Sequence, residues 1–154
     1  MELNPAAKSL YKRNEFNHYR IENIGNELKT WVNGKPVAYV IDTLDKSGFI
    51  GLQVHGIGNI LENDGKKVYF KNINIQTENL KPKAFPKGIY TVNLTPNTLS
   101  AYEKSEGYKL LFDGKTSNGW VGAHKTNFPE KGWKIADGII SVEPSGGAES
   151  TNGG

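Results

Sequence analysis

Short runs in which apolar and polar residues alternate follow one another along this chain, and they predict strands rather than helices. Alternation with period two over four to eight residues is the pattern of a strand with one buried face. Such runs cover residues 17–24, 28–32, 37–41, 49–55, 68–75, 89–93, 108–112, 119–122, 133–136 and 139–142. Many short strands with almost no helix predict an all-β fold, an antiparallel sandwich or barrel.

Turn chemistry separates several of these runs. Asn33-Gly34 stands between two of them, and Asp137-Gly138 stands between two others. Both dipeptides tolerate the positive φ of a type I′ turn, so each predicts a β-hairpin. Pro36 cannot donate a ladder hydrogen bond and is expected at an edge or outside the pairing. Short helical turns are expected over Ala6–Tyr11 and after Ser100, whose capping box with Glu103 precedes a helix that ends at Gly107.

The run at 49–55 divides into two faces. Ile50, Leu52 and Val54 share one face, which we expect in the core, whereas Gln53 and His55 lie with Phe49 on a mixed face that can line a groove. The run at 68–75 changes parity part-way, and a β-bulge near Lys71-Asn72 would reconcile its two halves.

Composition and charge exclude several classes of protein. The 154 residues carry 19 basic and 16 acidic side chains, and the basic ones never cluster beyond pairs, so no nucleic-acid partner is expected. No run reaches the about 18 apolar residues of a membrane span. The absence of Cys excludes thiol nucleophiles and Cys-based zinc sites, and the three His have no metal-like spacing. We expect neither a metal nor a cofactor. Residues 1–12 lack the apolar core of a signal peptide, so the chain alone does not reveal its compartment.

Two groups of motifs resemble one known family. NEFNHYRIE at 14–22, LKTWVNG at 28–34, GFIGLQVHG at 48–56 and VYFKNINI at 68–75 resemble the C-terminal half of the 3-keto-disaccharide hydrolase domain. LFDGKTSNGW, ending at residue 120, and GWKIADG at 132–138 resemble the start of the same domain. In this chain the motifs of the domain's C-terminal half precede the motifs of its start. We therefore expect the C-terminal half of one sandwich domain at 1–76, a linker with a short helix at 77–106, and the start of a second domain at 107–154.

The resemblance implies a concanavalin-A-like jelly roll, incomplete in this chain, with a carbohydrate groove on its concave face. It also implies hydrolysis of glycosides whose sugar carries a 3-keto group, and a periplasmic or secreted location. The ketone acidifies the C2 hydrogen, so removal of that proton lets the C1 substituent leave before water adds back. This chemistry needs a positioned base and a group that polarises the ketone. The alternative is a non-catalytic carbohydrate-binding or interaction module on the same scaffold, because fold alone does not decide function.

Four residues are candidates for the site. His55 is the catalytic candidate because imidazole exchanges protons near neutral pH, although it could instead fix the turn at Gly56. Gln53, Trp31 and Lys71 are candidates for substrate binding, and Trp31 could equally pack in the core. The family pattern carries Trp and Arg where this chain has Phe16 and Lys71, and Lys lacks the bidentate fork of Arg. We expect the isolated chain to be inactive, and to be either marginally folded or self-associating through open sheet edges.

Overall fold

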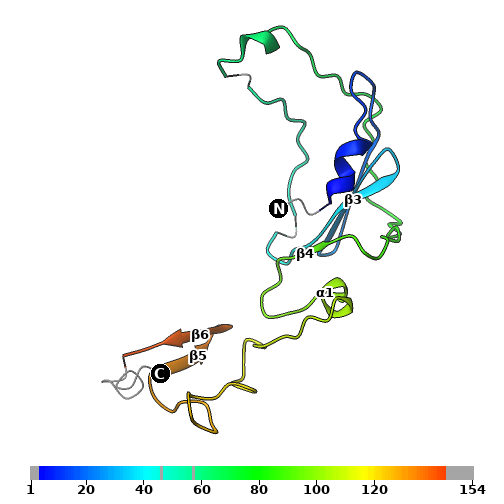
Figure 1. Ribbon diagram of the computed structural model, residues 1–154. Helices are drawn as coiled ribbons and strands as arrows, with labels where there is room; N and C mark the ends of the chain where they lie inside the picture. Colours follow the sequence, from blue (N-terminus) through cyan, green and yellow to red (C-terminus); the bar gives the residue numbers. More distant parts are fainter. Residues whose placement is uncertain (1–3, 46, 57, 145–154) are drawn as a thin grey trace.

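The computed structural model describes residues 4–45, 47–56 and 58–144, and in them it confirms the all-β class (Figure 1). A four-stranded sheet contains β1 (Tyr19–Ile24), β2 (Glu27–Val32), β3 (Lys35–Ile41) and β4 (Thr91–Asn93), and a separate hairpin contains β5 (Trp133–Ala136) and β6 (Ile139–Val142). The helical segments described are the 3-10 turns η1 (Pro5–Leu10) and η2 (Leu61–Asn63) and the α-helix α1 (Ala101–Ser105).

Local turn chemistry explains the antiparallel pairs. Asn33 and Gly34 join β2 to β3 with φ of 49° and 79°, and Asp137 and Gly138 join β5 to β6 with φ of 52° and 77°. Positive φ at both central residues is the type I′ geometry that the two dipeptides predicted. β1 and β2 are joined by a two-residue turn that begins at Gly25, whose φ is 63°. Both predicted hairpins are confirmed.

The short strand predicted within 89–93 is also present, and it forms the one parallel pair among the described strands. β4 pairs with Tyr39–Ile41 of β3 and does not reach Pro36, which pairs with Trp31 beside an irregularity in the β2–β3 register. No β4 residue therefore pairs with Pro36, and its lack of an N–H costs no ladder hydrogen bond on the β4 side, as expected for a proline in a sheet.

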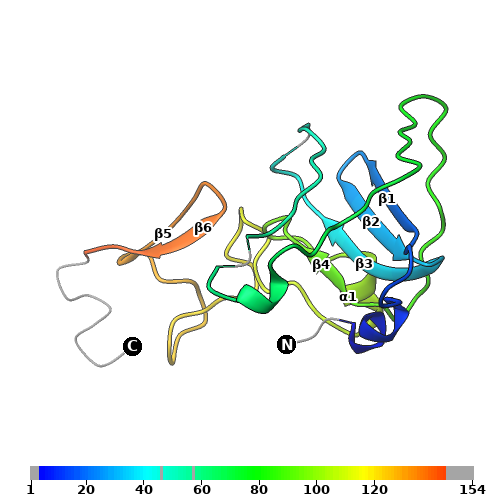
Figure 2. The ribbon, with the colours of Figure 1, turned by 90° about the horizontal axis from the view of Figure 1, so that it is seen from above.

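Four predicted strands are absent, at 49–55, 68–75, 108–112 and 119–122. Their residues run as loops beside the sheets (Figure 2), and Leu52, expected in the core, is 57% exposed. A strand is stable only when neighbours supply backbone hydrogen bonds and cover for its apolar side. The described residues provide no such neighbour for these runs. The bulge expected at Lys71-Asn72 consequently has no ladder to interrupt, although Asn72 does adopt a positive φ of 53°.

The predicted capping box is present at the start of α1. The Ser100 hydroxyl accepts the Glu103 N–H at 3.1 Å, and the Glu103 carboxylate accepts the Ser100 N–H at 2.7 Å. Asn93 at the end of β4 also donates to Glu103, at 3.1 Å, which ties the helix to the sheet. Gly107, with φ of 86°, follows the helix as predicted. The helix lies between the four-stranded sheet and the β5–β6 hairpin (Figure 1), and the Gly/Ser-rich tail 145–154 lies outside the described residues.

Asn33 anchors the N-terminal segment to the β2–β3 turn. Its Oδ1 accepts the His18 N–H at 2.9 Å, and its Nδ2 donates to the Leu10 carbonyl at 2.7 Å and to Asn17 Oδ1 at 2.8 Å. Asn17 in turn donates to the Lys12 carbonyl at 2.8 Å. The Asn33 side chain thus holds together the β2–β3 turn and the segment that leads into β1.

We expect Asn33→Ala to lower the free energy of unfolding by about 1–3 kcal/mol more than Asn79→Ala does. Both residues have a positive φ, 49° and 54°, so the matched control carries the same backbone cost but none of the Asn33 side-chain bonds. Urea unfolding followed by circular dichroism measures the difference. Equal destabilisation by the two variants would show that the network contributes nothing.

Candidate functional site

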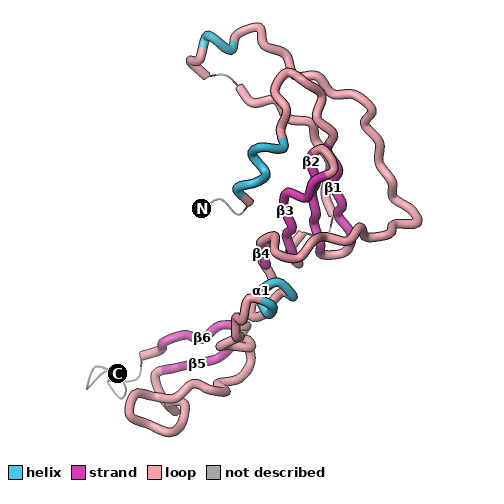
Figure 3. The backbone as a smooth tube through the Cα atoms, turned by 45° about the vertical axis from the view of Figure 1, so that its right-hand side comes forward, coloured by secondary structure: helices cyan, strands magenta, loops and turns pink. Residues whose placement is uncertain are grey.

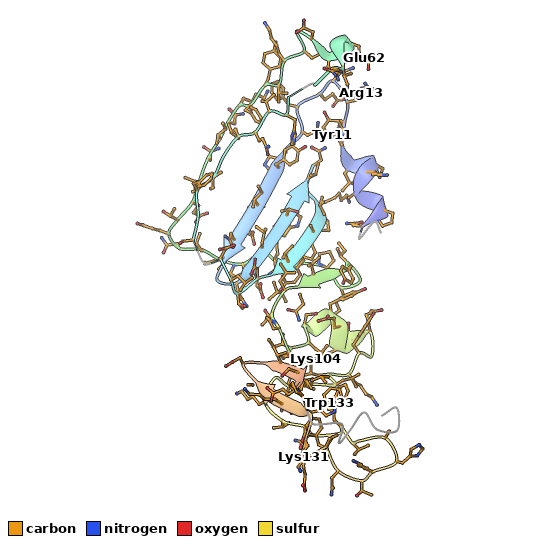
Figure 4. The ribbon with its side chains drawn as sticks, turned by 90° about the vertical axis from the view of Figure 1, so that its left-hand side faces the viewer. Tyr11, Arg13, Glu62, Lys104, Lys131 and Trp133 are labelled. Carbon is orange, nitrogen blue, oxygen red and sulfur yellow. The ribbon has the colours of Figure 1, made fainter. Side chains whose placement is uncertain are left out.

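One face of the four-stranded sheet carries charged and aromatic side chains in alternation. Antiparallel partners point to the same side of a sheet, and the register pairs Arg20 with Trp31, Glu22 with Lys29, and Lys29 with Tyr39. We name this set the charged aromatic face; its members are Arg20, Glu22, Glu27, Lys29, Trp31 and Tyr39. Figure 4 draws the sheet with its side chains. The opposite face is apolar and open: Ile21 is 65% exposed, and Leu28 and Val40 are half-buried.

Trp31 lies on β2, the middle of the three strands that carry the charged aromatic face, and is 2% exposed. The ring of Phe85 meets it edge-on with centroids 5.5 Å apart, and meets Tyr39 in the same way at 5.3 Å. The Arg20 guanidinium lies 5.9 Å from the centroid of the Trp31 ring, and Lys83 Nζ lies 5.4 Å from it. Both distances allow cation–π attraction. Three rings therefore form a small cluster bordered by cations.

Glu22 is a buried carboxylate on this face. Its Oε1 accepts from Arg20 Nε at 2.9 Å, and its Oε2 accepts the backbone N–H of Lys83 at 2.9 Å. Burial by itself raises the pKa of Glu22, but the Lys83 N–H and the Arg20 guanidinium outweigh it, so the pKa lies below its ordinary value. Glu22 is thus held ionised.

Glu27, Lys29 and Tyr39 form the second polar group. Lys29 Nζ donates to Glu27 and lies 4.7 Å from the centroid of the Tyr39 ring. The hydrogen bond from Lys29 lowers the pKa of Glu27. Burial, followed by the hydrogen bond to the negative Glu27, raises the pKa of Tyr39 to about 12. The phenol therefore stays protonated as a donor throughout the physiological range.

Between pH 10 and about 12, we expect the free energy of unfolding to fall more steeply with pH for the unaltered chain than for the Tyr39→Phe variant. Over this range an unfolded tyrosine loses its proton while folded Tyr39 keeps it, so the native state binds more protons and its advantage declines as pH rises. Urea unfolding across this window measures the slope, and absorbance at 295 nm follows phenol ionisation. Identical slopes would mean that Tyr39 titrates like a free tyrosine.

The charged aromatic face has the chemistry of a binding surface for a sugar ring. Aromatic side chains offer apolar contact to the C–H face of a pyranose, while carboxylates accept from hydroxyls and cations donate to them. It is a poor source of a general base, since an efficient base has a pKa near the working pH and both carboxylates are shifted downward.

The four residues predicted for the site do not converge. Trp31 lies on the charged aromatic face, but Gln53 and His55 are exposed on the loop at 47–56. Lys71 Nζ lies 3.9 Å from the centroid of the Phe16 ring. Within the part of the chain that the structure describes, no hydrogen bond or ring contact joins these four residues to one another. Their roles remain predictions.

Phe16 and Lys71 are the two positions at which the chain departs from the family pattern, and the structure places them in contact. A Lys cation over the face of a Phe ring is a cation–π contact. Phe16 is exposed, and the contact ties the start of the first motif to the loop at 68–75.

Five members of the charged aromatic face were not predicted from the sequence: Arg20, Glu22, Glu27, Lys29 and Tyr39. A turn at Gly25-Asn26 was the available signal, because a hairpin there places alternate residues of 19–24 on the same face as alternate residues of 27–32. Phe85 had no local signal, since it reaches the face from a segment without regular structure.

Residues 1–76 match the model of the 3-keto-alpha-glucoside-1,2-lyase-like domain. The chain is also similar to a 3-keto-disaccharide hydrolase of Bacteroides thetaiotaomicron, with 49% identity over 49 residues. The matched segment is 32% of this chain and 17% of the relative, so the chain spans less than a fifth of that protein. The family that the first group of motifs indicated is confirmed for residues 1–76.

Among the residues that the structure describes, no group of three His, Asp or Glu side chains lies close enough together to hold a metal ion. None of the helices in the described part is long and apolar enough to cross a membrane.

Proposed function

We propose that residues 1–76 are part of a carbohydrate-active domain that hydrolyses 3-keto-glycosides. The family match carries this proposal, and the charged aromatic face supports it, because stacking rings flanked by fixed charges suit a sugar. The name of the similar protein, a 3-keto-disaccharide hydrolase, points to the same substrate class. A carbohydrate is then the partner, and a periplasmic or secreted location is part of the same proposal.

In this proposal His55 removes or returns the proton at C2 of the keto sugar. Gln53 hydrogen-bonds sugar hydroxyls, Lys71 contacts the oxygen-bearing side of the substrate, and Trp31 supports the ring. His55 is exposed on its loop, so the residues that complete its surroundings come from the remainder of the domain.

A non-catalytic carbohydrate-binding module is the second candidate function. One observation favours it: the ionised carboxylates of the charged aromatic face are already engaged by Arg20, Lys29 and the Lys83 N–H, and His55 lies elsewhere. Such a face binds without chemistry.

An assay of the full-length parent protein separates the two functions. A methyl 3-keto-glucoside and the unoxidised glucoside are supplied in parallel, and binding and release of methanol are measured for each. Turnover restricted to the keto sugar supports the hydrolase, and binding without turnover supports the module. If the parent neither binds nor cleaves either sugar, both candidates are wrong.

The domain organisation is a proposal as well. Residues 77–106 connect the two motif groups, and residues 107–154 are proposed as the start of a second domain of the same kind. Their local structure includes a turn at Asp113, whose Oδ1 accepts the N–H groups of Lys115 and Thr116 at 2.8 and 2.7 Å.

We expect the isolated 154-residue chain to self-associate and to lack hydrolytic activity. The outer edge of β1 is unpaired and carries the exposed Ile21, and such edges pair with other chains. Light scattering after size-exclusion chromatography should show masses above 17.0 kDa. Ile21→Lys should shift the chain toward the monomer, because a charge on an edge strand blocks pairing. A monomer at every concentration, or turnover by this chain, would contradict the expectation.

A further inference from the structure

Residues 81–86 form a strap that crosses the charged aromatic face before the chain enters β4. Figure 3 shows the loop that leads into β4 running beside the sheet. The strap has no regular secondary structure, and Phe85 alone among its side chains is half-buried while the others are exposed. It touches the face at two described points: the Phe85 ring against Trp31 and Tyr39, and Lys83 against Glu22 and Trp31.

We propose that Trp31 and Tyr39 form a ring-binding site for a sugar, and that Phe85 of the strap occupies this site until the sugar displaces it. The inference rests on the proposed function, because that function supplies the sugar as the ligand. The strap is then an internal competitor built into the chain.

The polar side chains around Phe85 suit a ligand with hydroxyl groups better than they suit a phenyl ring. The site is bordered by Arg20, Lys29, Glu22 and Glu27, whose hydrogen-bonding capacity a hydrocarbon ring cannot use. A six-membered sugar ring has about the same breadth as a benzene ring and adds hydroxyls at its rim. It can therefore keep the contact with Trp31 and also bond to the surrounding charges.

The strap is built to lie on the face without joining the sheet. Pro82 and Pro86 stand on either side of Lys83 and Phe85 and lack N–H groups, so the segment cannot pair as a regular strand. Its one described hydrogen bond to the face is that from the Lys83 N–H to Glu22, at 2.9 Å. A segment held by one ring, one hydrogen bond and one cation–π contact can open locally while the sheet stays folded.

The experiment compares the full chain with its Phe85→Ala variant. The probe is methyl 3-keto-glucoside, and its binding is measured by titration calorimetry. Acrylamide quenching of Trp31 is measured in a background where Trp120 and Trp133 are replaced by Phe, so that Trp31 alone fluoresces. Phe128→Ala is the matched control, because Phe128 contacts Trp133 in the hairpin, away from the strap.

We expect Phe85→Ala to increase Trp31 quenching and to bind the sugar at least about tenfold more tightly, while Phe128→Ala leaves both unchanged. Lys83→Pro, which removes the N–H donor but keeps the Phe85 ring, should give a smaller gain in the same direction. Circular dichroism tests whether each variant retains the sheet. If Phe85→Ala fails to fold, Lys83→Pro replaces it in the comparison.

Two results overturn the inference and can be told apart. If Trp31 stays protected, or if affinity equals that of the unaltered chain, the strap does not compete and the proposed function stands. If Trp31 becomes accessible but no variant binds the sugar, the ring-binding site is wrong, and the assay of the full-length parent decides the proposed function separately.

Discussion

Replacing Trp31 by Ala should lower the free energy of unfolding by about 3–5 kcal/mol, the usual cost of removing a large buried aromatic side chain. Trp31 is 2% exposed and contacts Phe85, Arg20 and Lys83, so the variant leaves a cavity and two cations without their aromatic partner. Urea unfolding followed by circular dichroism measures the loss.

Trp133→Ala is the control for Trp31, because Trp133 is 40% exposed and lies in the separate β5–β6 hairpin. Its effect on unfolding of the four-stranded sheet should be within about 0.5 kcal/mol, as for most surface substitutions. A loss below about 1 kcal/mol for Trp31→Ala would show that Trp31 is not packed as described.

Replacing His55 by Ala in the full-length parent should lower turnover of a 3-keto-glycoside by at least about 100-fold, the contribution of a positioned acid or base. Stability should change by less than about 0.5 kcal/mol, because His55 is exposed. Steady-state kinetics and a thermal melt are measured on the same preparation.

His18→Ala is the matched control, since His18 is also exposed and its described hydrogen bonds involve only its backbone groups. It should retain full activity. Activity that survives His55→Ala together with a sharp drop in melting temperature would make His55 a structural residue.

Elements that depend on neighbouring residues were predicted well. The hairpins at Asn33-Gly34 and Asp137-Gly138 and the capping box at Ser100 form because a few adjacent side chains meet the demands of a turn or a helix end. The family of residues 1–76 was likewise recognisable from four short motifs.

Strand predictions were wrong where the structure supplies no distant partner strand. The runs at 49–55 and 68–75 have the alternation of strands, yet they remain loops because no described strand pairs with them. Alternation of apolar and polar residues indicates which side chains would share a face if the segment were a strand. Only a neighbouring strand supplies the backbone hydrogen bonds that stabilise it as one.

The sequence by itself determined the all-β class, the turns and the family resemblance of residues 1–76, because these depend on local conformational preference and on short motifs. Only the tertiary structure revealed the charged aromatic face and its strap. The face required the β1–β2–β3 register, which places alternate residues of three strands side by side. The strap required Phe85 to meet Trp31 across 54 positions of sequence, a contact that no local pattern specifies.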